Sequence, residues 1–113
     1  TALLVDASAD QVQINATPIL GLTQSLSGAG AVDVVSAITE VVTTGTNALT
    51  IAAGVEGQLK FIVMKTDGGV GTLTPASFTG GTTIAFQDVG DSVLLLYTNS
   101  SWFCIANQGC TIA

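Results

Sequence analysis

Two segments of the sequence, QLKFIVMKT (residues 58–66) and SVLLLYT (residues 92–98), carry the strongest structural signal. Alternate residues of a β-strand point to opposite faces of a sheet, so each segment presents two separate sets of side chains. In both segments, both sets are apolar. They are Leu59, Phe61 and Val63 against Ile62 and Met64 in the first segment, and Val93, Leu95 and Tyr97 against Leu94 and Leu96 in the second.

A strand of an antiparallel sandwich normally keeps one face polar and in contact with water. A strand that is apolar on both faces needs cover on both sides, and the sequence predicts no helix that could provide it. The simplest cover is a second copy of the chain, which makes Ile62, Met64, Leu94 and Leu96 the predicted interface of a homo-oligomer. Alternatively, Met64, Leu94 and Leu96 lie beneath the N-terminal segment of the same chain.

The rest of the chain also predicts strands. Strand-like runs recur roughly every eight to twelve residues, which is typical of a sandwich or barrel. They cover residues 31–35, 38–43, 48–52, 58–66, 71–74, 82–86, 92–98 and 102–106. Asp67-Gly68 is the strongest hairpin signal between them, because both residues tolerate a positive φ. We therefore expect an all-β protein: a single antiparallel β-sandwich or jelly-roll-like domain of about eight strands.

The first 30 residues follow a different pattern, in which Pro18, Gly21 and Gly28 interrupt a polar stretch with scattered aliphatic residues. Such a segment is either a flexible end or an extended arm that lies along a neighbouring molecule. The number of aliphatic residues favours the arm. Its predicted contact residues are Leu3, Val5, Ile19, Leu20 and Leu22. The predicted organisation is an N-terminal arm (1–30), a β-sandwich domain (31–106) and a C-terminal extension (107–113).

The charged side chains exclude several classes of function. Of 113 residues, eight are acidic and two are lysines, with no arginine or histidine, which gives a net charge of −6. A chain without histidine cannot build a histidine-dependent triad, and an acidic surface repels nucleic acid. No uninterrupted apolar run reaches the roughly 20 residues of a membrane helix. We expect no enzymatic activity, no nucleic-acid partner and no membrane partner.

No group of residues matches a catalytic or metal-binding pattern. Asp88 and Asp91 share a loop, but the chain lacks the repeated acidic spacing of a calcium loop. The glycine-rich turns lack the lysine of a phosphate-binding loop. Cys104 and Cys110 have neither metal nor redox spacing, so they are either reduced or joined in a small terminal disulfide loop. We expect no catalytic residue, no cofactor and no metal.

A longer run of motifs is more specific than the strand pattern. It consists of GVEGQLKFIVMKTDGG (residues 54–69), TLTP (72–75) and FTGGTTIAFQDVGDSVLLLYTNSSWFCIA (78–106). Together these motifs resemble a pattern in virion surface proteins of tailed phages, especially cyanophages and other marine phages, and the resemblance covers residues 31–106. The motifs are structural, so the resemblance implies no catalytic or ligand residue.

The resemblance implies a capsid decoration (cement) protein, because the chain is short and shows no separate receptor-binding domain. Such a protein would form a homotrimer on the capsid surface of the virion, contact the major capsid protein and stabilise the shell. The alternative is a fibre or spike adhesion module that binds host-surface glycans. That function needs an exposed aromatic platform with polar neighbours, for which Trp102, Tyr97, Asn99 and Asp91 are the candidates.

Overall fold

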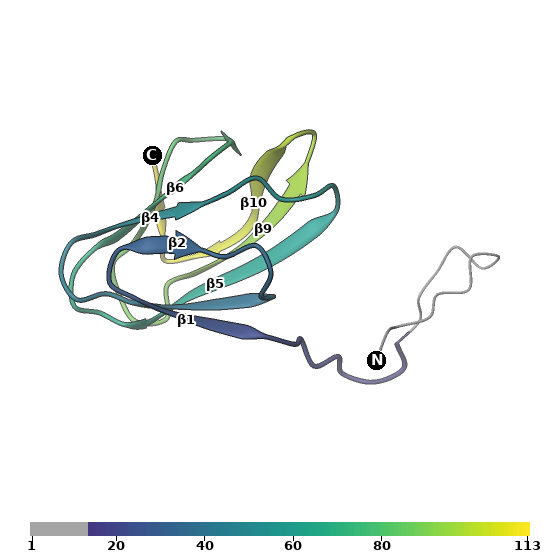
Figure 1. The fold of residues 1–113 in the computed structure, drawn as a ribbon, viewed down its shortest axis with the longest axis horizontal. Coiled ribbons are helices and arrows are strands. Elements are labelled where there is room, and N and C mark those ends of the chain that lie inside the picture. Colours follow the sequence, from purple (N-terminus) through teal and green to yellow (C-terminus); the bar gives the residue numbers. More distant parts are fainter. Residues whose placement is uncertain (1–13) are drawn as a thin grey trace.

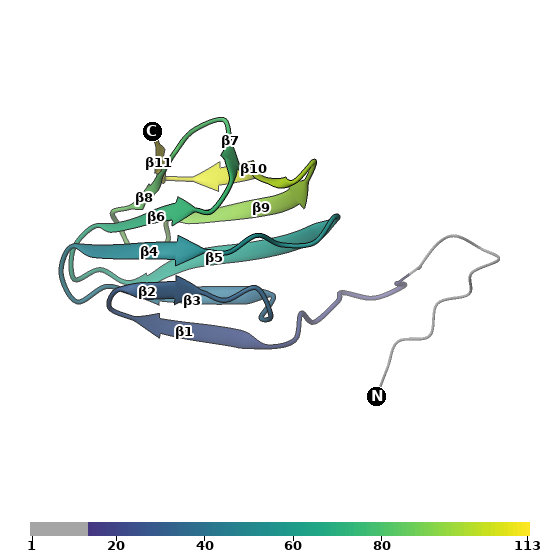
Figure 2. The same cartoon turned by 45° about the horizontal axis from the view of Figure 1, so that its top comes forward.

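The fold consists of two β-sheets that lie face to face (Figures 1 and 2). The computed structural model describes residues 14–113, and this range contains eleven strands and no helix. Sheet A has the order β1 (Thr23–Ser27), β3 (Ile38–Val42), β5 (Gln58–Thr66), β9 (Ser92–Thr98), β10 (Ser101–Gln108), β7 (Phe78–Thr79). Sheet B has the order β11 (Thr111–Ile112), β8 (Ile84–Phe86), β6 (Gly71–Pro75), β4 (Asn47–Ile51), β2 (Gly30–Val32). The predicted all-β class is confirmed.

The first half of the chain winds as a flattened coil. From β1 to β6, consecutive strands alternate between the sheets, and parallel pairing joins β1 to β3 to β5 and β2 to β4 to β6. This is the arrangement of a β-solenoid. Antiparallel pairing then adds β9 to β5 and β10 to β9 in sheet A, and β8 to β6 and β11 to β8 in sheet B. The short strand β7 completes sheet A by pairing parallel with β10. The two sheets are mixed, so the expected antiparallel sandwich or jelly roll is wrong in strand direction.

The turn after β5 explains this difference. Asp67-Gly68 predicts a hairpin, but here the turn carries the chain from sheet A to sheet B and stacks on the preceding turn at Thr43. The Thr43 hydroxyl accepts a hydrogen bond from the Gly68 N–H (2.8 Å) and donates one to the Gly69 carbonyl (2.8 Å). A Cβ on Gly68 would lie 2.2 Å from the Thr43 carbonyl oxygen, so only glycine allows this approach.

A two-residue hairpin joins β9 to β10. Asn99 and Ser100 have φ angles of 52° and 57°, as a type I′ turn requires. Thr98 consequently lies opposite Ser101, and the two strands pair along most of their length. The hairpin places the apolar segment 92–98 directly against the C-terminal strand of sheet A.

The core lies between the two sheets. Its fully buried large side chains come from both sheets and are Val32, Val41, Leu49, Ile51, Ile62, Met64, Leu73, Ile84, Phe86, Leu95 and Trp102. The Trp102 indole N–H donates a hydrogen bond to the Ala52 carbonyl at 2.9 Å. Its ring meets Tyr97 edge-on, with ring centroids 5.0 Å apart. Because strand residues alternate, the side chains between these core positions point to the outer faces of the two sheets.

The folded domain extends further at both ends than the predicted residues 31–106. β1 and the first residue of β2 lie within the predicted arm, and the predicted C-terminal extension contains the end of β10 and all of β11, which pairs with β8. Of the described residues, only 14–22 precede the sheets (Figure 1). The arm boundary therefore moves to Thr23. β1 is polar, with one aliphatic residue, Leu26, so its sequence carries little strand signal.

Replacing Thr43 with valine should lower the free energy of unfolding by about 1–3 kcal/mol. Valine keeps the shape of the side chain but leaves the Gly68 N–H and the Gly69 carbonyl without their partner. Thr50→Val, on the exposed face of β4, is the matched control and should change stability by less than about 0.5 kcal/mol. Urea unfolding followed by the fluorescence of Trp102 measures both. Equal stability of the two variants would contradict this role for the Thr43 hydroxyl.

Candidate functional site

The two outer faces of the protein differ in chemistry. Along β4 and β6 of sheet B, the outward side chains are small: Ala48, Thr50, Thr72 and Thr74. Along β5 and β9 of sheet A, they are mostly large and apolar: Leu59, Phe61, Val63, Leu94 and Leu96. A sheet face that meets water is normally polar, and a contiguous apolar surface indicates an interaction site. The outer face of sheet A is therefore the candidate functional site.

Strand register gathers these side chains into one patch, the apolar face, which consists of Leu59, Phe61, Val63, Leu94, Leu96 and Phe103. Leu59 lies opposite Leu96, and Phe61 lies opposite Leu94. On the other side of β9, Phe103 of β10 lies opposite Leu96. Side chains directly opposite each other in antiparallel strands are in contact distance, so the patch is continuous across β5, β9 and β10.

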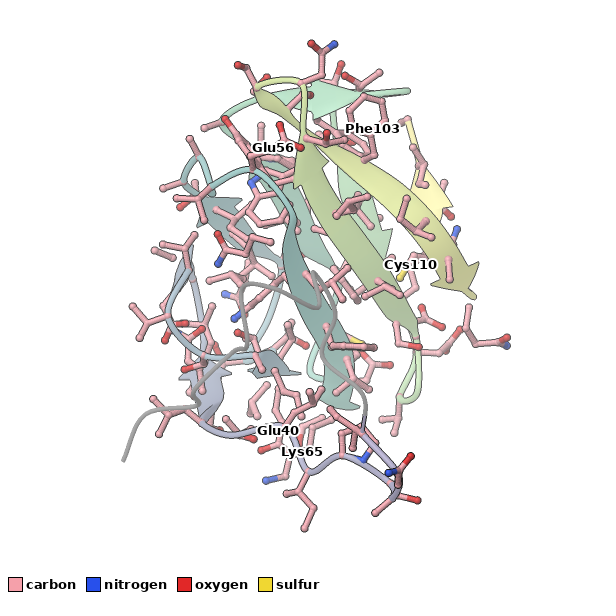
Figure 3. All side chains as sticks on the ribbon, turned by 90° about the vertical axis from the view of Figure 1, so that its right-hand side faces the viewer. Glu40, Glu56, Lys65, Phe103 and Cys110 are labelled. Atoms are coloured by element: carbon pink, nitrogen blue, oxygen red, sulfur yellow. The ribbon has the colours of Figure 1, made fainter. Side chains whose placement is uncertain are left out.

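Charged groups border the apolar face at its two ends (Figure 3). At one end, the Lys65 ammonium lies 3.7 Å from the Glu40 carboxylate, and both side chains are partly exposed. At the other end, Glu56 accepts hydrogen bonds from the Thr98 hydroxyl and, at 3.2 Å, from the Asn99 N–H. The residues of the apolar face between these ends carry no charge, which lowers the desolvation cost of covering it.

A groove of about 560 Å³ crosses the apolar face. Phe61, Val63 and Leu94 line it from β5 and β9, and Ala106 lines it from β10. Leu20, from the segment that precedes β1, lines it as well. The chain's own N-terminal segment therefore already reaches the surface that the apolar strands leave open.

Two of the four predicted interface residues do not lie on this surface. Ile62 and Met64 are fully buried between the sheets, so they are core residues in the folded chain. Leu94 and Leu96 point outward and are partly exposed. The sequence analysis missed Leu59 and Phe61, the outward residues of β5, because alternation alone does not tell which set of a doubly apolar strand faces inward.

The predicted arm residues fall in different places. Ile19 is 96% exposed and Leu22 is 68% exposed, whereas Leu20 lines the groove. Leu3 and Val5 lie outside the described residues. The described part of the arm thus leaves four large aliphatic side chains exposed before β1: Ile14, Ile19, Leu20 and Leu22.

Within the described interior, Lys60, Asp33 and Ser36 form a charged network. Lys60 points inward from β5 and is fully buried. Its ammonium donates to the Ser36 carbonyl at 2.7 Å and to Asp33 Oδ1 at 3.4 Å. The Asp33 carboxylate also accepts hydrogen bonds from the Ser36 N–H at 2.8 Å and the Ser36 hydroxyl at 3.1 Å. The network ties β5 to the loop after β2, which is a structural role.

Burial and pairing shift the pKa of both charged groups. Burial lowers the pKa of the Lys60 ammonium below its ordinary 10.5, although the charge and hydrogen bond of Asp33 oppose the shift. Burial raises the pKa of the Asp33 carboxyl. The hydrogen bonds from Ser36 and the charge of Lys60 outweigh that effect, so this pKa lies below its ordinary 3.8.

The residues considered for calcium or glycan binding take structural positions. The Asp91 carboxylate accepts hydrogen bonds from the Gln87 and Asp88 N–H groups at 2.8 and 3.0 Å, and so fixes the turn before β9. Trp102 and Tyr97 are buried in the core, so neither belongs to an exposed aromatic platform.

The two cysteines are free thiols. Burial raises the pKa of the Cys110 thiol to about 12, so it stays protonated and unreactive at neutral pH. Burial also raises the pKa of the Cys104 thiol. Among residues 14–113, no three or more histidine, cysteine, aspartate or glutamate side chains form a group that could hold a metal.

No protein-family model matches the chain, and no curated protein matches its sequence. The described residues contain no helix long and apolar enough to cross a membrane.

Replacing Asp33 with alanine should destabilise the fold more than replacing it with asparagine. Asparagine keeps an acceptor for the Ser36 N–H, whereas alanine removes both this acceptor and the negative charge beside Lys60. We expect losses of about 3 kcal/mol for alanine and about 1–2 kcal/mol for asparagine at neutral pH. Urea unfolding measures both, and equal losses would contradict a turn-fixing role for the side-chain oxygen.

The lowered pKa of Asp33 also predicts the response to acid. The carboxyl has a lower pKa in the folded chain than its ordinary 3.8. Its stabilising contribution is therefore complete above this pH and is lost as the pH falls through the folded value. The wild-type chain should lose stability more steeply than Asp33→Asn below about pH 4. If the free energy of unfolding falls equally with pH in the two proteins, this prediction is wrong.

Proposed function

We propose that this chain is a structural virion protein that binds the outside of a phage capsid and stabilises the shell as a homo-oligomer. The observation that carries the proposal is the apolar face of sheet A, which is large, continuous and uncharged. The resemblance of residues 31–106 to virion surface proteins of tailed phages supports a virion location for this surface. In this proposal the chain has no catalytic role and takes no cofactor.

The apolar face suits contact between copies of the chain. Leu59 is 51% exposed and Phe61 is 37% exposed in the single chain. Each ~100 Å² of apolar surface covered would contribute a gross ~2.5 kcal/mol before the cost of association. The resemblance favours a trimer, in which three copies of sheet A around one axis cover all three apolar faces together.

The arm suits contact with the major capsid protein. Its described aliphatic residues include Ile19 and Leu22, which are 96% and 68% exposed. A short extended segment gains little from folding onto its own domain, and ordering it costs about 1–2 kcal/mol of backbone entropy per residue. Burial of these side chains against the shell would offset that cost, so the arm anchors the oligomer.

The aromatic residues predicted for glycan binding do not lie at the surface. The glycan-binding alternative requires aromatic rings at the surface beside polar groups. Trp102 and Tyr97 instead pack against each other inside the core. The capsid-binding function is therefore the one that the described surfaces favour.

Leu96→Asp should dissociate the oligomer at the apolar face. The carboxylate would lie between Leu59 and Phe103, where association would remove it from water without a partner. Thr74→Asp, on the outer face of sheet B, is the matched control and should leave the assembly unchanged. Light scattering measures the mass of both variants, and circular dichroism checks their folding. An unchanged mass for Leu96→Asp would contradict this use of the apolar face.

Deleting residues 1–22 should weaken attachment to the shell while leaving both sheets folded and the oligomer intact. The deletion ends immediately before β1, so it removes no described strand. The measurement is co-sedimentation of the truncated and full-length proteins with capsids assembled without this protein. Undiminished binding would show that the arm is not the anchor, and loss of the circular dichroism signal would show that it belongs to the folded domain.

A further inference from the structure

A second surface is the edge of sheet A at β1, which no strand of residues 14–113 covers on its outer side. Sheet A ends at β1 and β7, and sheet B ends at β2 and β11. β1 and β2 are consecutive in the coil and lie at the same end of the stacked sheets (Figure 2). An edge strand presents backbone N–H and C=O groups that another strand can bind.

The two ends of the molecule differ in how these edges are protected. At one end, β7 and β11 have two residues each and offer few groups for pairing. At the other end, β1 has five residues, TQSLS, and all five pair with β3 without a bulge. Proteins normally protect an edge of this length with charges, prolines or bulges, and β1 has none of these.

Hydrogen bonds of an inward side chain fix the position of β1. Gln24 points inward and bridges the two sheets. Its amide donates to the Ala31 carbonyl of β2 at 3.0 Å, and its oxygen accepts from the Thr39 hydroxyl at 2.8 Å and the Asp33 N–H at 2.9 Å. These bonds satisfy part of the edge of sheet B and fix β1 beside β3. The free edge of β1 is therefore already in a strand conformation when a partner arrives.

We propose that β1 pairs with β1 of a second copy in the antiparallel direction, so that the two copies share one continuous sheet A. A two-fold axis at Ser25 places Thr23 opposite Ser27 of the second copy, and Gln24 opposite Leu26 of the second copy. This register pairs all five residues of the strand. The outward side chains are then hydroxyl groups, which form favourable cross-strand pairs.

A second copy suits this edge better than head-to-tail stacking does. Stacking would join β1 to β7 of the next copy, which matches five residues with two, and it would continue into a filament instead of closing. Two-fold pairing joins equal strands and closes. The chain carries a net charge of −6, so copies repel each other in general, but β1 itself carries no charge.

This contact is separate from the apolar face. The edge of β1 points along the plane of sheet A, whereas the apolar face points away from that plane. Both contacts can therefore form at once, and the β1 contact would join one oligomer built on the apolar face to another. The inference goes beyond the proposed function and does not depend on it.

Oxidative cross-linking tests the two-fold axis directly. In Ser25→Cys, the two thiols face each other at Cα separations of about 4.5–5.5 Å, within the range of a disulfide. We expect a disulfide-linked dimer on a non-reducing gel, formed at least about tenfold faster than with Thr74→Cys on the outer face of sheet B. Cys104 and Cys110 are present in both variants. Equal cross-linking rates would overturn the proposal.

A second experiment separates the edge from the apolar face. Leu96→Asp should sediment as a dimer held by β1. Adding Ser25→Lys to this variant places two lysines opposite each other across the two-fold axis and should give monomers. Adding Thr23→Lys together with Ser27→Asp instead places opposite charges across the contact and should keep the dimer. A natively folded but monomeric Leu96→Asp protein would overturn the β1 contact. A Leu96→Asp protein as large as the wild type would instead count against the apolar face.

Discussion

The close stacking of the turns at Thr43 and Gly68 sets the path of the chain. Gly68 has no side chain, and the Thr43 hydroxyl forms hydrogen bonds with both Gly68 and Gly69. The chain therefore crosses to sheet B after β5 instead of reversing within sheet A. β5 thus runs parallel to β3 and keeps its other edge free for β9. This central position of β5 is what brings Leu59 and Phe61 beside the leucines of β9. The apolar face is therefore a consequence of the coil.

The orientation of β5 combines a buried lysine with exposed apolar side chains. Its inward side chains include Lys60, while Leu59 and Phe61 point to the solvent side. Rotating the strand by one residue would bury Leu59 and Phe61, but it would also turn Ile62 and Met64 out of the core. Because the strand is apolar on both faces, either orientation leaves apolar side chains on the outer face of sheet A. In the observed orientation, Asp33 and Ser36 satisfy the buried Lys60 ammonium group.

Much of this architecture can be predicted from sequence, but its geometry cannot. Residues 58–66 and 92–98 form strands with the predicted bounds, because long apolar runs rich in β-branched and aromatic residues leave few alternatives. The sequence does not predict strand direction, because inward and outward side chains alternate in the same way in parallel and antiparallel sheets. The contact that decides the direction joins Thr43 to Gly68, which are 25 positions apart. The orientation of β5 also depends on a contact between distant residues, because the partner of Lys60 is Asp33, 27 positions away.

The type I′ turn at Asn99 and Ser100 also bears on the order of folding. It connects two paired strands through only two residues, whereas each parallel pairing of the coil must first close a much longer loop. The β9–β10 hairpin can consequently form early and serve as the template on which β5 and then β3 are laid down. Leu96 and Phe103 meet in this first step, so part of the apolar face would form before the coil is complete.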